Sequence, residues 1–240
     1  MRIELSRDFD ATEWDALVDG AAGSNFFQTS VWLRALERAP GARSPHVLTA
    51  RESGRLVAGL PAMTRSLGGA RILESMPFGS FGGPVVGPDA PDDAAPRLLE
   101  AFARDARSPR VAAAHIAEWP GGDGTPPGFV AATGRAQVVD LDGSYAEVEA
   151  RFTPSARNKV RKARRAGVTV RHASSDADIG AYWDMLAESA ERWGERPAVG
   201  PEFLRALHAL GGDRVQFLFA EHDGAPGGAD LNVIHGGTVF

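Results

Sequence analysis

The sequence predicts an α/β (α+β) fold in two similar halves, each a mixed, largely antiparallel twisted sheet flanked by helices. In each half a short strand precedes two helices of amphipathic spacing, and antiparallel strands joined by tight turns follow. The Pro/Gly-rich stretch PGGDGTPPG separates the halves, which predicts domains at 1–135 and 136–240. A length of 240 residues, 43% of them hydrophobic, is enough to bury a sizeable core.

The first half is predicted to alternate strands and helices around an antiparallel meander. Apolar residues recur at helical spacing in ATEWDALVDG and in SNFFQTSVWLRALERAPG, where Pro40 and Gly41 end the helix. The sequence between residues 45 and 87 alternates apolar runs with turn signals. The predicted elements are a strand at 2–5, helices at 11–20 and 24–39, meander strands at 46–52, 55–66 and 71–78, a loop at 79–93, a helix at 95–106 and a short buried strand at 111–119.

The second half repeats this order behind a basic helix. Thr153 and Pro154 open that helix, because proline is tolerated at the first helical position, and Gly167 ends it. The predicted elements are a strand at 136–142, helices at 144–152, 154–166, 179–193 and 201–210, a strand at 168–173, a hairpin at 215–235 and a strand at 238–240. The first half continues past its meander and the second does not. We therefore expect an incomplete second domain, in the N-terminal part of a longer protein.

Composition excludes several classes of site. Cysteine is absent, so no disulfide, thiol nucleophile or Cys-ligated zinc is possible. The six histidines have no metal-ligand spacing and no G-x-S-x-G elbow occurs, so we expect no metal and no serine-hydrolase site. The charged start MRIELSRDFD is unlike a signal peptide, and no apolar run could span a bilayer, which predicts a soluble cytoplasmic protein.

Charge is concentrated in one segment. Residues 151–175 hold eight of the 26 Arg and Lys and none of the 31 Asp and Glu, which leaves 18 basic against 31 acidic residues elsewhere. Within the basic helix, Ala156, Val160 and Ala163 form a thin apolar seam. The segment is interpreted as a solvated helix face, an RNA-binding helix or a pocket wall for one anionic group. An acidic body argues against general nucleic-acid binding, because long-range attraction would be lost.

Other motifs have two interpretations each. Arg65–Ala70 matches the acyl-CoA signature [RQ]-x-x-G-x-[GA], but a strand follows it, which favours a hairpin turn. Gly79–Gly83 (GSFGG) is a second candidate for a pyrophosphate loop, although it lacks the lysine of a P-loop. Trp32, Trp183 and Trp193 lie on helical faces and are expected in the core. Asp230 and Asn232 share one face of a strand, either in a site or on an exposed sheet face.

Four blocks together resemble the FemAB-type transferases of the GNAT (acyl-CoA N-acyltransferase) superfamily. The first, SNFFQTSVWLRALE, is similar to an F-x-Q-S/T-x-x-W opening, and TPSARNKVRKARRAGVTV is similar to a basic helix followed by Gly-Val and a strand. The helix–loop–helix YWDMLAESAERWGERPAVGPEFLRAL and the hairpin VQFLFAEHDGAPGGADLNVIHGGTVF follow in the same order. These blocks lie between residues 24 and 240.

The resemblance implies tandem GNAT-like domains, the second one partial, and transfer of an acyl group to an amine. Its peptidoglycan members use aminoacyl-tRNA as donor and a cell-wall precursor as acceptor, whereas other members use acyl-CoA and some are linked to exopolysaccharide synthesis. It also implies that Arg157, Lys159 and Arg161, with Arg34 and Trp193, bind a phosphate-bearing acceptor. No coiled-coil arm follows the basic helix here, which favours acetyl-CoA or another acyl-CoA over aminoacyl-tRNA as the donor.

The chemistry expected from this resemblance needs no covalent intermediate. The protein orients a donor carbonyl and an acceptor amine, and backbone N–H groups stabilise the oxyanion. Asp230 and Glu188 are candidate general bases, and a chain of waters could serve instead. A non-catalytic anion-binding module of the same fold is an alternative to the enzyme.

Overall fold

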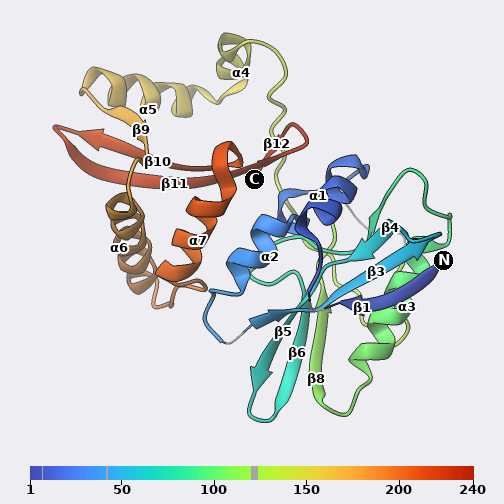
Figure 1. Cartoon of the computed structure of the whole chain (residues 1–240). Coiled ribbons are helices and arrows are strands. Elements are labelled where there is room, and N and C mark those ends of the chain that lie inside the picture. Colours follow the sequence, from blue (N-terminus) through green and yellow to red (C-terminus); the bar gives the residue numbers. More distant parts are fainter. Residues whose placement is uncertain (7, 42, 120–123) are drawn as a thin grey trace.

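The computed structural model describes residues 1–6, 8–41, 43–119 and 124–240, which form three four-stranded sheets (Figure 1). All named strand pairs are antiparallel except β6–β8, which is parallel. The sheets have the orders β1 (Arg2–Ser6), β3 (Val47–Glu52), β4 (Arg55–Leu60), β7 (Val85–Val86); β2 (Arg43–Pro45), β5 (Met63–Leu67), β6 (Ala70–Ser75), β8 (Val111–Ile116); and β12 (Thr238–Val239), β11 (Ala225–His235), β10 (Val215–His222), β9 (Thr169–His172).

The halves repeat one order of elements, as the sequence predicts. In the first, β1 is followed by two α-helices and the β3–β4 hairpin; in the second, β9 is followed by two α-helices and the β10–β11 hairpin. The edge strand pairs with the first hairpin strand in both halves. The helices are α1 (Ala11–Gly20), η1 (Phe26–Gln28), α2 (Ser30–Leu36), α3 (Ala94–Ala106), α4 (Tyr145–Arg151), α5 (Pro154–Arg165), α6 (Asp176–Arg192), α7 (Pro201–Gly211) and η2 (Gly212–Arg214).

One hydrophobic core joins the two halves. It contains Trp14 of α1 and Trp32 of α2 together with Ile179 of α6 and Phe203 of α7. A second cluster lies in the first half, where α3 packs Leu98 and Phe102 onto β3 and β4. Because the larger cluster takes side chains from both halves, the halves do not bury separate cores, and the boundary at residue 135 remains a prediction.

The predicted strand at 136–142 is wrong. These residues form no ladder, and Val138, Val139 and Leu141 are all more than half exposed. Arg151 donates to the carbonyls of Asp140 and Asp142, which holds this segment against α4. A strand needs a neighbouring edge as well as alternating apolar residues, and no strand in the described residues pairs with this segment.

Three further elements differ from expectation. The predicted strand at 55–66 is split at Pro61, so that β4 and β5 belong to different sheets. The predicted helix at 24–39 is two shorter pieces, η1 and α2, each capped by a side chain. Strand β8 lies at an edge and is half-buried to exposed, whereas the sequence predicted a buried strand. The predicted loop at 120–128 falls partly on residues 120–123, outside the described residues.

Candidate substrate-binding site

Helix α5 carries six cations that no carboxylate neutralises. Its boundaries follow from local chemistry: the Thr153 hydroxyl accepts from the Ala156 N–H, Pro154 is the first helical residue, and Gly167 has φ 83°. Within the described residues, none of its arginines and lysines forms an ion pair. The cations are Arg157, Lys159, Arg161, Lys162, Arg164 and Arg165.

The polar contacts of these arginines go to neutral groups. Arg157 donates to the Ala150 carbonyl at 2.7 Å, and Arg161 donates to the Asn158 side chain. Arg164 donates to the Tyr145 hydroxyl at 2.7 Å and also lies over its ring. By contrast, the nearby Arg171 of β9 is fully paired, because it contacts Asp178 and Glu221 at 2.8 Å each. The positive charge of α5 is therefore uncompensated, unlike that of its neighbour.

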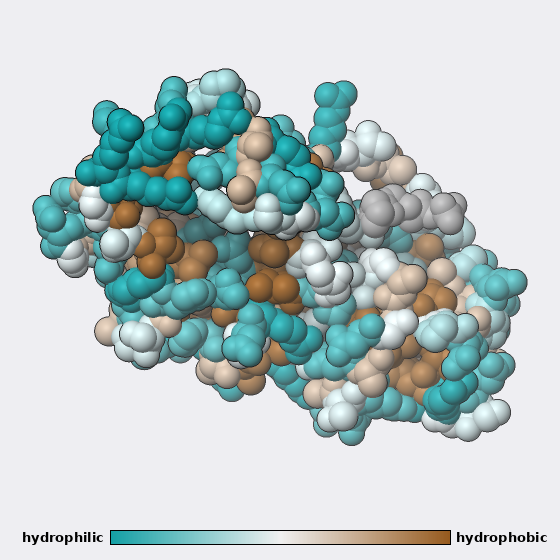
Figure 2. Space-filling model, turned by 90° about the horizontal axis from the view of Figure 1, so that it is seen from above, coloured by the Kyte–Doolittle hydropathy of each residue, from teal (hydrophilic) through white to brown (hydrophobic). Residues whose placement is uncertain are grey.

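The α4–α5 hairpin lies on the outside of the molecule. Neither helix has a buried residue, and in α5 only the seam of Ala156, Val160 and Ala163, with Arg157, is half-buried. Figure 1 places both helices at the edge of the molecule, on the side of the third sheet. Seen from above, this region is strongly hydrophilic, and hydrophobic residues are visible between it and the rest of the protein (Figure 2).

The other predicted site residues lie apart from α5. Arg34 is engaged within the first half: it forms ion pairs with Asp8 and Glu37 at 3.3 Å each and lies over the Phe9 ring. Trp193 caps the C-terminal end of α6 and is 80% exposed, so its expected place in the core is wrong. Trp32 is buried and Trp183 is half-buried against the shared core, as expected.

Asp230 is exposed on β11, and its carboxylate lies 3.4 Å from the Asn232 amide nitrogen, as their shared face predicts. Across the described residues, no hydrogen bond, ion pair or ring contact links any two of Arg34, Arg157, Lys159, Trp193 and Asp230. The same holds for Arg161. The structure thus provides one cationic helix and several separate candidates, and their roles remain predictions.

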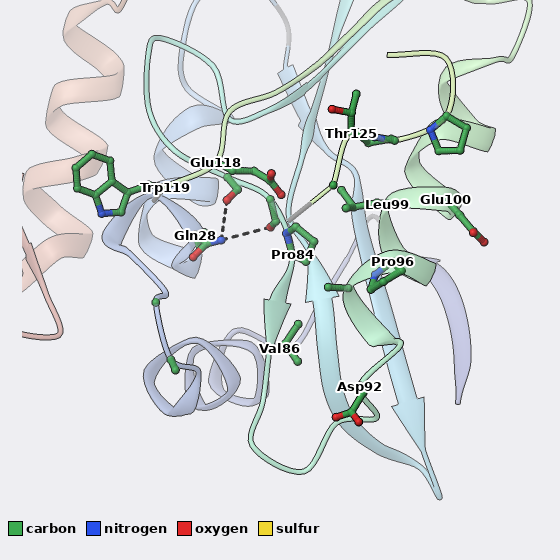
Figure 3. Close-up of a pocket in the computed structure, with 18 residues that line it drawn as sticks. Gln28, Pro84, Val86, Asp92, Pro96, Leu99, Glu100, Glu118, Trp119 and Thr125 are labelled. Carbon is green, nitrogen blue, oxygen red and sulfur yellow. Dashed lines mark hydrogen bonds between the residues drawn. The ribbon is translucent and has the colours of Figure 1, made fainter. Parts of the chain in front are cut away.

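A cavity of about 590 Å³ lies in the first half, beside the Gly79–Gly83 loop (Figure 3). It is bounded by the start of α3, by β7 and by the segment that follows β8. Its lining includes three acids and no Arg, Lys or His: the acids are Asp92, Glu100 and Glu118, beside Trp119 and Gln28. No residue of α5 lines it. The F-x-Q motif and GSFGG were the available signals, but they lie more than 50 residues apart.

Gln28 holds one wall of this cavity in place. Its buried amide nitrogen donates to the carbonyls of Gly82 and Gly83 at 3.0 and 3.3 Å, and its oxygen accepts from the Asn25 N–H (Figure 3). Gly82 is required here, because a Cβ atom would lie 2.4 Å from the Ser75 hydroxyl. The side chain of Gln28, in the F-x-Q motif, therefore fixes the loop at Gly82 and Gly83 by hydrogen bonds.

Neither glycine-rich candidate forms a cradle for the acyl-CoA pyrophosphate. Arg65–Ala70 is the β5–β6 turn, with Gly68 and Gly69 at φ 52° and 90°, as the sequence favoured. In the second candidate, the Gly82 N–H donates to the Ala117 carbonyl and the Gly83 N–H donates to Ser75 Oγ, so neither donor is free for phosphate.

The next helix N-terminus has the wrong charge for phosphate. Helix α3 begins at Asp93, which gives no side-chain cap, and Asp92 precedes it, so two carboxylates lie where an anion would bind. The Arg65–Ala70 turn, the Gly79–Gly83 loop and the N-terminus of α3 therefore do not fit the acyl-CoA pyrophosphate.

Two further properties of the described residues concern metal binding and membrane-spanning helices. In the described part of the chain, no group of three or more His, Asp or Glu side chains is arranged to hold a metal ion. The same residues contain no helix with the length and apolar character needed to cross a membrane.

Comparisons with known proteins address the family and the fold. Residues 150–240 match the family described as acetyltransferase (GNAT) domain. The crystal structure of FemX is similar, with a TM-score of 0.61 and 14% sequence identity over 93% of this chain. This chain spans 58% of the FemX chain.

A second solved structure, the ribosomal-protein-alanine N-acetyltransferase from Brucella melitensis biovar Abortus 2308, is 19% identical over 59% of this chain and 100% of its own, with a TM-score of 0.36. No curated protein matches the chain. The FemX match confirms the predicted likeness in fold to FemAB-type transferases, and the acetyltransferase (GNAT) model matches residues 150–240, within the second half of the chain.

Proposed function

We propose that this chain is part of an acyltransferase that moves an acetyl or aminoacyl group onto an amine of a phosphate-bearing cell-envelope or polysaccharide precursor. The observation that supports this most is the uncompensated charge of α5, within the segment that matches the GNAT family. An ordinary surface helix gains stability from oppositely charged neighbours, whereas six like charges repel one another. A phosphate ligand restores the balance, and arginine binds phosphate through two parallel hydrogen bonds.

In this proposal Arg157, Lys159 and Arg161 hold the acceptor. Arg157 is half-buried at the inner side of α5, which limits its motion and favours a fixed contact. The exposed indole of Trp193 offers an apolar surface for the acceptor, and Asp230 is the carboxylate that we propose to test as general base. Orientation of two bound reactants can lower the barrier of such a reaction by about 7–11 kcal/mol.

Kinetics with matched variants test the role of α5. Arg157→Ala/Arg161→Ala should raise KM for the phosphate-bearing acceptor by about 100-fold or more, because each of the two charge-assisted contacts is worth about 1.5–3 kcal/mol. The effect on kcat should be small, since these contacts are the same in the ground and transition states. Arg104→Ala/Arg110→Ala removes the same charge from exposed positions of the first half. An unchanged KM in the α5 variant, or an equal rise in both variants, would contradict the assignment.

A second candidate is a non-catalytic module that binds an anion. It is favoured by one observation, the lack of fit between the described glycine loops and acyl-CoA. Thermal unfolding of the protein with acetyl-CoA or with UDP-MurNAc-pentapeptide separates the alternatives. A rise in Tm with acetyl-CoA supports an acyl-CoA-dependent enzyme. A rise with the precursor alone, and no acyl transfer to it from acetyl-CoA or from aminoacyl-tRNA, supports the module. Transfer from aminoacyl-tRNA alone supports the aminoacyltransferase.

A further inference from the structure

The cations of α5 cannot all serve one small ligand. Successive residues of a helix are rotated by about 100°, so Arg157 and Lys159 flank the apolar seam on its two sides, whereas Arg165 lies opposite the seam. Lys162 and Arg165 lie more than about 120° from the seam of Ala156, Val160 and Ala163, on the outward side of the helix. Both are exposed, and neither makes a polar side-chain contact within the described residues. A ligand held on the inner side of α5 leaves these two charges unexplained.

The form of this surface favours a broad anionic partner. Lys162 and Arg165 are exposed, and their helix α5 lies at the edge of the molecule (Figure 1). Outside residues 151–175 the chain has 31 acidic and 18 basic residues. Charges are screened over about 8 Å at physiological ionic strength. A flat surface that touches only α5 therefore avoids most of the acidic body, whereas a long nucleic acid wrapping the protein would meet it.

The hairpin also lacks the features that bind RNA bases. Stacking on aromatic rings carries much of single-strand binding. Helix α5 contains no aromatic residue, and Tyr145 of α4 already holds Arg164. Asn158, the one amide of α5, accepts from Arg161. What remains is charge without base recognition, which is what a lipid headgroup surface requires.

We propose that the outward face of α5, centred on Lys162 and Arg165, docks the protein onto an anionic phospholipid surface. The contact is peripheral, with the helix lying on the headgroups. It goes beyond the proposed function, because Lys162 and Arg165 take no part in the proposed acceptor contacts.

Vesicle co-sedimentation tests this proposal without any acyl donor or acceptor, so it can fail or succeed independently of the proposed function. The protein is mixed with phosphatidylcholine vesicles that contain about 30 mol % phosphatidylglycerol, or none, at about 0.15 M and about 1 M salt. We expect binding only to the anionic vesicles and only at the lower salt. Each cation near such a surface contributes about fivefold to binding, so Lys162→Gln/Arg165→Gln should weaken it about 25-fold.

The matched control is Arg104→Gln/Arg110→Gln, which removes the same net charge from exposed positions of the first half and should bind like the unaltered protein. Absence of binding to anionic vesicles, or equal loss in both variants, would overturn the proposal. A competition with poly(U) RNA tests the alternative that this face of α5 binds RNA. If RNA binds more tightly than the vesicles and depends on Lys162 and Arg165, this face is a nucleic-acid surface and the lipid assignment is wrong.

Discussion

The indole of Trp32 and the ring of Phe203 meet edge to face across the junction of the two halves, with centroids 5.2 Å apart and planes at 89°. Trp32 belongs to α2 of the first half and Phe203 to α7 of the second. Both are buried, so the contact is part of the shared core. The two repeated units are consequently coupled through helices that hold equivalent places in each repeat.

Truncation of Trp32 should destabilise the whole chain. Trp32→Ala removes a buried indole that also packs on Phe26 and Phe27, and such changes cost about 3–5 kcal/mol. Because the core is shared, both halves should lose stability together. Urea denaturation followed by circular dichroism measures the free energy of unfolding. Trp193→Ala is the control, since that indole is exposed and its loss should cost less than about 0.5 kcal/mol. Equal losses in the two variants would contradict a shared core that depends on Trp32.

Loss of the Gln28 side chain should loosen the glycine loop. Gln28→Ala leaves the buried Gly82 and Gly83 carbonyls without this donor, which costs about 1–3 kcal/mol for each unsatisfied group. Hydrogen exchange at the Gly82 and Gly83 amides should accelerate, because both amides belong to the loop that the Gln28 side chain fixes. Gln137→Ala changes an exposed glutamine and should leave exchange at the loop unaltered. Unchanged protection of the loop amides in Gln28→Ala would show that the hydrogen bonds of Gln28 are not needed to order the loop.

The sequence predicts well where the signal is local. Helix α1 occupies the predicted residues because Asp10 caps its first turn and its apolar residues face one way. Helix α5 was located by Pro154 and Gly167 for the same kind of reason. The strand predicted at residues 136–142 is wrong, because alternation of apolar side chains does not show whether a strand edge is available for pairing.

The candidate site depends more on long-range geometry. The cationic run of α5 is visible in the sequence, but the lack of ion pairs to its cations, within the described residues, is a fact of tertiary structure. Trp193 has the helical spacing of a core residue and is nevertheless exposed, because it lies at the last turn of α6. Gln28 and Gly82 are 54 residues apart in the sequence, so no local pattern could predict the hydrogen bond between them.

Two glycines should respond to alanine with opposite signs. A Cβ atom at Gly59 would lie 2.5 Å from the Trp14 ring and 2.9 Å from the Leu48 carbonyl, so Gly59→Ala should destabilise by about 1–3 kcal/mol. Gly180 lies inside α6 with open space around its Cα, so Gly180→Ala should stabilise by about 0.5–1 kcal/mol. Thermal unfolding of both variants measures the difference. A stabilised Gly59→Ala variant would contradict the close approach of β4 to Trp14.

His235 should make stability fall as the pH falls below neutrality. Its ring lies at the junction of the halves, where Nε2 is 3.0 Å from Ser24 Oγ and Nδ1 is 3.7 Å from Asp19. Burial lowers the pKa of His235; Asp19 and Asp15 oppose this, and Arg214 adds to it. The unfolded chain, with a histidine pKa of about 6.5, therefore binds a proton before the folded protein does. The stabilising effect of a neutral His235 is complete above that pH and is lost as the pH falls toward the folded pKa.

A variant that keeps the hydrogen bond isolates this effect. His235→Gln can still contact Ser24 but does not titrate, so its free energy of unfolding should change less between pH 7 and pH 5 than that of the unaltered protein. The difference in slope can reach about 1.4 kcal/mol per pH unit. His222→Gln is the control, because it makes the same substitution at a more exposed imidazole, beside Asp223. The free energy of unfolding could instead change with pH to the same extent in His235→Gln and in the unaltered protein. Protonation of this ring would then not affect the junction, and Arg214 and Asp19 would stabilise the junction at both pH values.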